Sequence, residues 1–326
     1  MPAIIWISKE SFMKPFHWES THGNFGDDLN LWLWDFLLPG LRDTHEDTLL
    51  VGVGTVLNTE ILPAEGRKLV IGSGFGYGSL PDISDRSQWD VRCVRGPLTA
   101  QKAGLPTEMG IVDPAVLVTE MPEFQNLPKT GKRTFIPHWE SAAAGLWPEI
   151  CKTVGLSYLD PRGEAKAVIR ELATSELVVA ESMHGAILAD AFRVPWIAVS
   201  SSRSINSFKW NDWARSLGVT YAPKHIPVST RAEAIAKGAK FWGVGFERNK
   251  QAAAELEKPR QGETVLLADP EQTPLRSMAK QALAMPSTLA LWQASKAKPQ
   301  LSKDGALAAC KERLMEVIAG VRRDYL

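Results

Sequence analysis

Residues 177–199, LVVAESMHGAILADAFRVPWIAV, decide the fold. The apolar run at 177–180 shows no alternation, which is typical of a strand buried on both faces of a parallel sheet. A polar turn at 181–185, a short helix at 186–192 and a second apolar strand at 196–199 follow. This order predicts an α/β protein whose ligand site lies at the carboxyl ends of parallel strands.

The polar turn carries His184 beside Gly185, at the start of the predicted helix. Glycine lets the backbone come close to a ligand, and the N–H groups of a helix's first turn attract anions. A single histidine in a loop is more often a structural, hydrogen-bonded residue than a catalytic one. Because Glu181 and Ser182 accompany it at a strand end, we interpret His184 as a candidate catalytic group.

Composition narrows the class of protein. A chain of 326 residues is long enough for two domains, each with its own core. The 37 Lys and Arg balance the 37 Asp and Glu, so no overall field favours nucleic acid. Cys93, Cys151 and Cys310 lie far apart without metal-ligand spacing, which favours a reducing compartment and no metal site. With no signal peptide or membrane span visible, we expect a cytoplasmic protein.

The first half contains four expected strands, at 3–7, 49–53, 69–71 and 90–94, and a further strand ending at Asp113. Residues 23–38, GNFGDDLNLWLWDFLL, predict a helix capped by Asp27 or Asp28, with apolar residues at helical spacing. The turn that precedes it, with Asn24 between two glycines, suits close approach of a ligand or simply a helix start. The residues leave these two readings open.

A glycine-rich segment and an arginine follow the next strands. GSGFGYG at 72–78, which includes Gly74, has Tyr77 where a dinucleotide fingerprint needs its third glycine. We therefore expect a loop beside a polar ligand rather than a nicotinamide site. Alternation places Arg92 and Arg95 on different faces, and Arg95, at the strand end, is the better candidate for the ligand crevice.

A proline-punctuated polar stretch at 121–132 predicts the boundary between the halves. The second half begins with a strand ending at His138, and Lys209 lies in the first turn of an expected helix at 207–217. Alanine-, lysine- and glutamate-rich helices with one apolar stripe each make up the tail, and acidic residues argue against a membrane role for the last one. The predicted units are 1–125, 126–246 and a helical extension at 247–326.

Taken in order, six segments resemble the polysaccharide pyruvyl transferase family, in particular the bacterial exopolysaccharide ketal pyruvyl transferases of the succinoglycan type. The resemblance covers about residues 3–245. The segments are GNFGDDLN, the GSG loop, VRGPLTA, GIVDPAVL, IPHW and ESMHGAILADAFRVPWIAV followed by a lysine. No one of them is specific alone; their order over two α/β units carries the resemblance.

The resemblance implies a GT-B-like fold, with two Rossmann-like domains facing a cleft and neither metal nor nicotinamide cofactor. The implied reaction moves the carboxyethylidene group of phosphoenolpyruvate onto two hydroxyls of a sugar, in an exopolysaccharide or its lipid-linked repeat unit, and releases phosphate. It also implies an oligosaccharide or lipid-linked acceptor as partner, no nucleic acid, and peripheral association with the inner face of the cytoplasmic membrane or the assembly machinery.

By the same resemblance, His184 is the acid that protonates the donor and Arg95 binds the donor's anionic groups. Many members carry Arg two positions before the motif histidine, where this chain has Ser182. Lys209, Arg203 or backbone N–H groups near Gly185 are the candidates to replace it. The full set of predicted substrate-binding residues is Asn24, Asp27, Gly74, Asp113, His138, Glu181, Ser182, Arg203 and Lys209.

Three other functions remain open from the residues. A nucleotide-sugar glycosyltransferase of GT-B architecture would bind diphosphate at a helix N-terminus and basic residues. A non-catalytic subunit of a polysaccharide-assembly complex would use the tail to bind a partner. A dinucleotide oxidoreductase is disfavoured by the broken glycine pattern.

Overall fold

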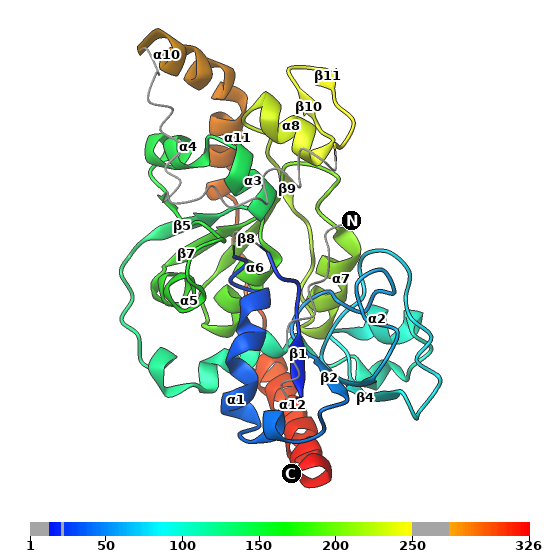
Figure 1. Cartoon of the computed structure of the whole chain (residues 1–326). Coiled ribbons are helices and arrows are strands. Elements are labelled where there is room, and N and C mark those ends of the chain that lie inside the picture. Colours follow the sequence, from blue (N-terminus) through cyan, green and yellow to red (C-terminus); the bar gives the residue numbers. More distant parts are fainter. Residues whose placement is uncertain (1–12, 21–22, 250–273) are drawn as a thin grey trace.

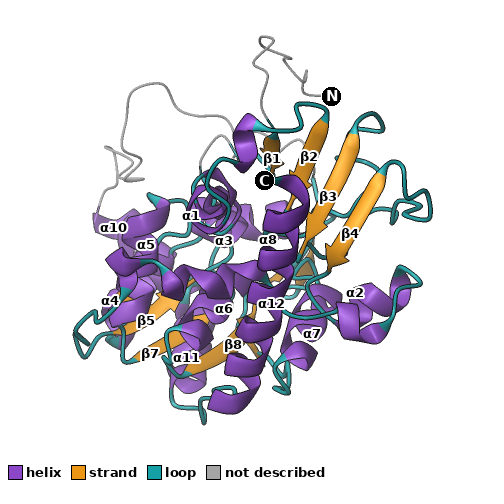
Figure 2. Ribbon diagram, turned by 90° about the horizontal axis from the view of Figure 1, so that it is seen from below, coloured by secondary structure: helices purple, strands orange, loops and turns teal. Residues whose placement is uncertain are grey.

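The computed structural model describes residues 13–20, 23–249 and 274–326. The first half is built on a sheet in the order β1-β2-β3-β4, in which every neighbouring pair runs parallel. Figure 2 shows β2, β3 and β4 side by side. The strands are β1 (Lys14–Phe16), β2 (Thr48–Val51), β3 (Arg67–Ile71) and β4 (Trp89–Cys93).

The second half is built on a parallel sheet in the order β6-β5-β7-β8-β9. Its central strand β7 (Leu177–Ala180) is buried along its whole length, as the uninterrupted apolar run predicts. The mixed α/β class with parallel sheets is thus confirmed. The remaining strands are β5 (Arg133–Ile136), β6 (Ser157–Tyr158), β8 (Trp196–Ser200), β9 (Lys224–His225) and the hairpin β10 (Lys240–Phe241) and β11 (Val244–Gly245).

Helices surround both sheets (Figure 1). The α-helices are α1 (Leu33–Leu37), α2 (Pro97–Lys102), α3 (Trp139–Ala144), α4 (Trp147–Val154), α5 (Ala165–Thr174), α6 (Met183–Ala191), α7 (Ser207–Ser216), α8 (Arg231–Lys237), α10 (Pro274–Leu283), α11 (Met285–Ser295) and α12 (Asp304–Tyr325). The 3-10 helices are η1 (Asp27–Leu31), η2 (Leu41–Asp43), η3 (Thr107–Met109), η4 (Pro114–Glu120) and η5 (Pro122–Phe124).

Some local predictions for the first half are wrong. The strand expected at 3–7 lies outside the described residues, and β1 forms from Lys14–Phe16, where no strand was expected. Pairing with β2 specifies this edge strand, because its three residues carry no apolar run of their own. The stretch before Asp113 is not a strand either, because only an isolated bridge joins Val94 to Gly110.

The predicted aspartate cap is also wrong. The residue at the N-cap of η1 is Gly26, and no side chain caps that helix. Asp28 instead accepts a hydrogen bond from the backbone N–H of Asn24 at 3.2 Å, and Asp27 accepts one from the Asn24 side-chain amide. The two carboxylates therefore stabilise the turn before the helix through hydrogen bonds.

One apolar cluster joins the two halves, in addition to a cluster in each half. A single cluster of buried side chains joins Leu33 of α1 and Val116 of η4 to Ile187 of α6 and Leu314 of α12. Every residue of α6 is buried, because this helix lies between its own sheet and the first half. Two further clusters cover the far faces of the sheets. One, around Phe135, belongs to the second sheet, and the other belongs to the first sheet.

Helix α12 connects the two halves. At its start Asp304 pairs with Arg193 of the second half at 2.6 Å, and at its end Asp324 pairs with Arg92 of β4 at 2.6 Å. The predicted apolar stripe faces the shared core, where Leu314 and Val321 are fully buried. Within the described part of the chain, no helix is long and apolar enough to cross a membrane.

Candidate active site

The candidate site lies where the carboxyl ends of the two parallel sheets meet. His184 begins α6 directly after β7, and Arg95 follows β4 in the other half. Lys209 enters from the first turn of α7. Contacts between the halves bring these elements together, because η4 packs on α6 and α2 packs on α7. The strand-end location predicted from the sequence is therefore where the halves touch.

His184 faces Asp113 across this junction. The imidazole Nε2 lies 3.8 Å from Asp113 Oδ2, and both atoms are buried without a hydrogen-bond partner. The other carboxylate oxygen of Asp113 accepts the backbone N–H of Ala115 at 3.0 Å. A buried polar atom without a partner costs about 1–3 kcal/mol, so a pair of them facing each other makes this place a candidate functional site.

Gly26 supports the other side of the imidazole. A Cβ atom placed on Gly26 would lie only 1.8 Å from His184 Nδ1. Gly26 has an ordinary right-handed conformation (φ −74°), so the need for glycine comes from space alone. The neighbouring Phe25 ring meets the imidazole edge-on, with centroids 6.3 Å apart. The turn at residues 23–26 therefore makes room for the imidazole and packs against it, and we call this turn the seat of His184.

Asp27 is a second titratable group beside the imidazole. Burial raises the pKa of its carboxyl, although the positive charges of His184, Lys209 and His17 act in the opposite direction. A carboxyl with a raised pKa holds and releases a proton closer to neutrality than an ordinary aspartate does. Asp27 is therefore a candidate for proton transfer.

Lys209 supplies a cation to the same space. Its charge opposes the rise that burial causes in the pKa of Asp27 and adds to the lowering of the pKa of His138 by burial, so the ammonium lies near both groups. Its Nζ lies 5.3 Å above the Tyr77 ring, next to the glycine-rich loop. Over the residues that the structure describes, no carboxylate forms an ion pair with Lys209. An ammonium group without a carboxylate partner is suited to binding an anionic ligand.

Arg95 is fully buried rather than open to solvent. Its guanidinium donates to Thr55 Oγ1 at 2.6 Å, to Phe75 O at 2.8 Å and to Asp212 Oδ2 at 3.2 Å. Three of its five N–H donors are thereby used. A Cβ on Gly74 would lie 2.2 Å from Arg95 Cζ, so this glycine makes room for the guanidinium.

Glu181 holds the ends of the second sheet together. Its oxygens accept bonds from the His138 backbone, from Ser141 and Ser201, and from Lys237 Nζ at 2.9 Å. Burial alone would raise the pKa of Glu181, but Lys237, His138 and the two hydroxyls bring it down to about 2. Its lone pairs are occupied within the protein.

His138 lies beside this network, at the N-terminus of α3. Its Nδ1 is 3.5 Å from Glu140 Oε2. Burial lowers the pKa of His138, with Glu140 opposing the shift. Burial would raise the pKa of Glu140, but His138, Arg248 and Lys237 lower it to about 2. His138 therefore favours its neutral form at the edge of the site.

The remaining predicted residues flank α6. Ser182 caps this helix, because its hydroxyl accepts the Gly185 N–H at 3.4 Å. Arg203 is exposed in the loop after β8. Asn24 contacts Asp27 within the seat of His184. Because residue 182 is serine and not arginine, the N-terminus of α6 lacks the positive charge that an arginine at this position would supply.

Sequence reasoning missed Asp212, the partner of Arg95. Besides the guanidinium, its carboxylate accepts the backbone N–H groups of Leu98 and Thr99, each at 2.9 Å, and the Thr99 hydroxyl at 2.6 Å. Asp212 therefore fastens α7 to the start of α2. Within WNDWARS nothing in the local pattern distinguishes it from a solvated helix residue.

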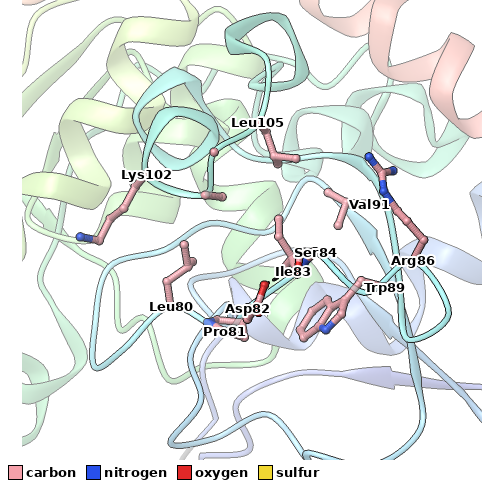
Figure 3. Close-up of a pocket in the computed structure, with 12 residues that line it drawn as sticks. Leu80, Pro81, Asp82, Ile83, Ser84, Arg86, Trp89, Val91, Lys102 and Leu105 are labelled. Carbon is pink, nitrogen blue, oxygen red and sulfur yellow. Dashed lines mark hydrogen bonds between the residues drawn. The ribbon is translucent and has the colours of Figure 1, made fainter.

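A hollow of about 440 Å³ lies elsewhere, within the first half (Figure 3). It is bordered by the loop that carries Leu80 and Ser84, by Trp89 of β4 and by Lys102 of α2. None of the predicted site residues lines it. Among the described residues, no three His, Cys, Asp or Glu side chains are grouped to hold a metal ion.

Comparison with known proteins identifies the family of the chain. The family model for polysaccharide pyruvyl transferase matches residues 22–203, which include the seat, Asp113 and His184. The chain belongs to this family and is a polysaccharide pyruvyltransferase. It is similar to the succinoglycan biosynthesis protein ExoV of Rhizobium meliloti (strain 1021), with 67% identity over 316 residues, covering 96% of this chain and 100% of that protein. No solved structure matches the chain.

Proposed function

We propose that the protein transfers the pyruvyl group of phosphoenolpyruvate, as a ketal, to two hydroxyls of a sugar in a bacterial exopolysaccharide or its lipid-linked repeat unit. Membership of the family supports pyruvyl transfer, and the name of its relative supports an exopolysaccharide. The observation that carries the proposal is the position of the His184 imidazole, which lies between Gly26 and the unpartnered carboxylate oxygen of Asp113.

The chemistry begins at C3 of the donor. The imidazolium of His184 gives its proton to C3, which becomes a methyl group, and C2 becomes electron-poor. A first sugar hydroxyl attacks C2 and its proton returns to the imidazole. The bond between C2 and the phosphate oxygen then breaks, the second hydroxyl closes the ketal, and its proton leaves with the phosphate. General acid catalysis of this kind contributes about 10²–10⁴ in rate.

The carboxylates have distinct roles in this proposal. Asp113 orients the imidazole and stabilises its charged form, as a buried carboxylate does for a catalytic histidine elsewhere. Asp27 takes the proton of the second sugar hydroxyl and passes it to the departing phosphate. Glu181, the other predicted proton acceptor, is less suited because all its hydrogen bonds go to groups of the protein.

The donor carries up to three negative charges, which the protein must match locally. Lys209 and the first-turn N–H groups of α6 are the groups we propose for its phosphate and carboxylate, with Arg203 as a further cation. Arg95 would join them through its two remaining donors. The transfer changes no oxidation state, so it calls for no nicotinamide, and we propose that phosphoenolpyruvate is its only small-molecule partner besides the sugar acceptor.

Incubation with phosphoenolpyruvate and candidate oligosaccharides tests the proposal, with phosphate release and product mass followed together. We expect phosphate and pyruvylated sugar in equal amounts. Thermal stabilisation separates the main alternative, because a glycosyltransferase would be stabilised by UDP-sugars and this enzyme by phosphoenolpyruvate. Turnover of a UDP-sugar without pyruvyl transfer would refute the proposed donor.

A further inference from the structure

Helices α10 and α11 and the β10–β11 hairpin expose large apolar side chains at one end of the molecule. Figure 1 shows these elements at the end opposite the C-terminus of α12. The exposed side chains are Trp242, Val244, Met278, Leu283, Met285, Leu289 and Trp292. Monomeric proteins rarely expose so many large apolar groups on neighbouring elements without using them for binding. We call this set the apolar end surface.

Helix α11 forms the centre of this surface. None of its residues is charged, although much of the helix is exposed. Met285, Leu289 and Trp292 recur at helical spacing and so share one face, where Trp292 is 47% exposed. The opposite face is already used, because Leu291 and Ala294 are buried in the core of the second half. Among the described residues, none covers this outward apolar face.

The hairpin extends the surface beyond the helices. Trp242 is 61% exposed, and its indole Nε1 donates to the carbonyl oxygen of Leu283 at 3.0 Å. This bond joins the turn of the hairpin to the end of α10. Two tryptophans and several aliphatic side chains thus lie on connected elements, and tryptophan is the residue that favours the boundary between lipid and water.

Helices α10 and α11 and the turn after them carry charges of one sign, whereas Glu149 on α4, which packs on α11, and Glu247 after the hairpin are exposed carboxylates nearby. Residues 274–303 contain Arg276, Lys280, Lys296, Lys298 and Lys303, which makes five cations, and no Asp or Glu, although the whole chain has 37 of each sign. Lys280, Lys296 and Lys298 are exposed. An apolar face on helices whose own charges are all cationic matches an anionic phospholipid surface.

We propose that the apolar end surface docks the protein on an anionic lipid bilayer. A second copy of the chain is a poorer occupant, because a two-fold interface would bring like charges together. Helix α12 does not compete for this role, since its apolar stripe is buried in the shared core. The inference does not depend on the reaction at His184.

Co-sedimentation of the full chain with phosphatidylglycerol-containing vesicles tests the proposal, with pure phosphatidylcholine vesicles as reference. We expect binding to anionic vesicles that weakens with salt. Leu289→Ser with Trp292→Ser should reduce it at least about tenfold, since each side chain loses an apolar contact. Met315→Ser, at a residue 43% exposed on α12, is the matched control and should leave binding unchanged.

Charge reversal provides the second arm. Lys280→Glu with Lys296→Glu should weaken binding to anionic vesicles by more than about tenfold, because each cation near such a surface contributes about 1 kcal/mol. Lys14→Glu, at an exposed residue of β1, should have little effect. All variants should melt like the wild type and turn over a water-soluble acceptor equally well, which separates docking from the reaction.

Two results would overturn the inference. One is equal sedimentation of the wild type and the Leu289→Ser, Trp292→Ser variant. The other is a wild-type dimer that these substitutions convert to a monomer without any vesicle binding, because the surface would then be an interface between copies of the chain.

Discussion

Nε2 of His184 and Oδ2 of Asp113 lie 3.8 Å apart at the junction of the two sheets, and neither has a hydrogen-bond partner. The distance is too long for a hydrogen bond. Because the two residues come from different halves, their spacing depends on how the halves pack. The shared apolar core, rather than either sheet alone, therefore sets the geometry of the site.

Asp113→Asn should lower kcat by about 10- to 100-fold with little change in KM for phosphoenolpyruvate, because the amide keeps the shape but loses the charge that supports the imidazolium. Steady-state kinetics across pH would measure this. A change confined to KM would assign Asp113 to donor binding instead.

Gly26→Ala should abolish most activity while leaving the fold intact, because the new methyl group occupies the position of the imidazole. Thermal melting and phosphate release would be compared in parallel. Gly305→Ala is the matched control, since its added Cβ meets no atom within 4 Å. Full activity in the Gly26 variant would show that the seat is not needed.

Lys209→Gln should raise KM for phosphoenolpyruvate by about tenfold or more, in line with the loss of a charge-assisted hydrogen bond. Lys102→Gln is the control, because Lys102 also lies over an aromatic ring, at 5.0 Å from that of Phe75, but outside the site. Equal effects of the two substitutions would remove Lys209 from the donor site.

Glu181→Gln should destabilise the fold by about 3–5 kcal/mol near neutral pH, because it leaves Lys237 buried without its partner. The native pKa of about 2 lies below the usual 4.5, so the contribution of Glu181 is present above about pH 4.5 and is lost as the pH falls toward 2.

Denaturant unfolding at pH 7 and at pH 3 measures this effect. The difference between wild type and variant should shrink at the lower pH. Glu171→Gln, which removes an exposed ion pair with Lys132, should cost less than about 1 kcal/mol at either pH. A pH-independent difference would contradict the depressed pKa of Glu181.

The strand, turn and helix around His184 could be predicted from sequence because each depends on local signals. The apolar run of β7 is buried as expected, and Ser182 caps the helix by accepting the backbone N–H of the residue three positions later. The resemblance carried by the six segments was confirmed by the family match. Local pattern also located the apolar stripe of α12.

Contacts between distant segments could not be predicted in the same way. β1 depends on its partner strand, and the pairing of Arg95 with Asp212 joins residues 117 positions apart. The sequence predicted Arg95 as a strand-end residue facing the crevice, but it carried no sign that the guanidinium would be buried against a carboxylate from α7. The seat of His184 at Gly26 likewise arises only when the halves pack.

The most direct test of the account follows pyruvyl transfer in D₂O by the wild type and by His184→Gln. The account predicts that the wild type places one deuterium in the new methyl group of each pyruvylated sugar. The variant should lose about 10²–10⁴ in rate with unchanged melting. A variant that transfers the pyruvyl group at close to the wild-type rate would contradict the central role of His184.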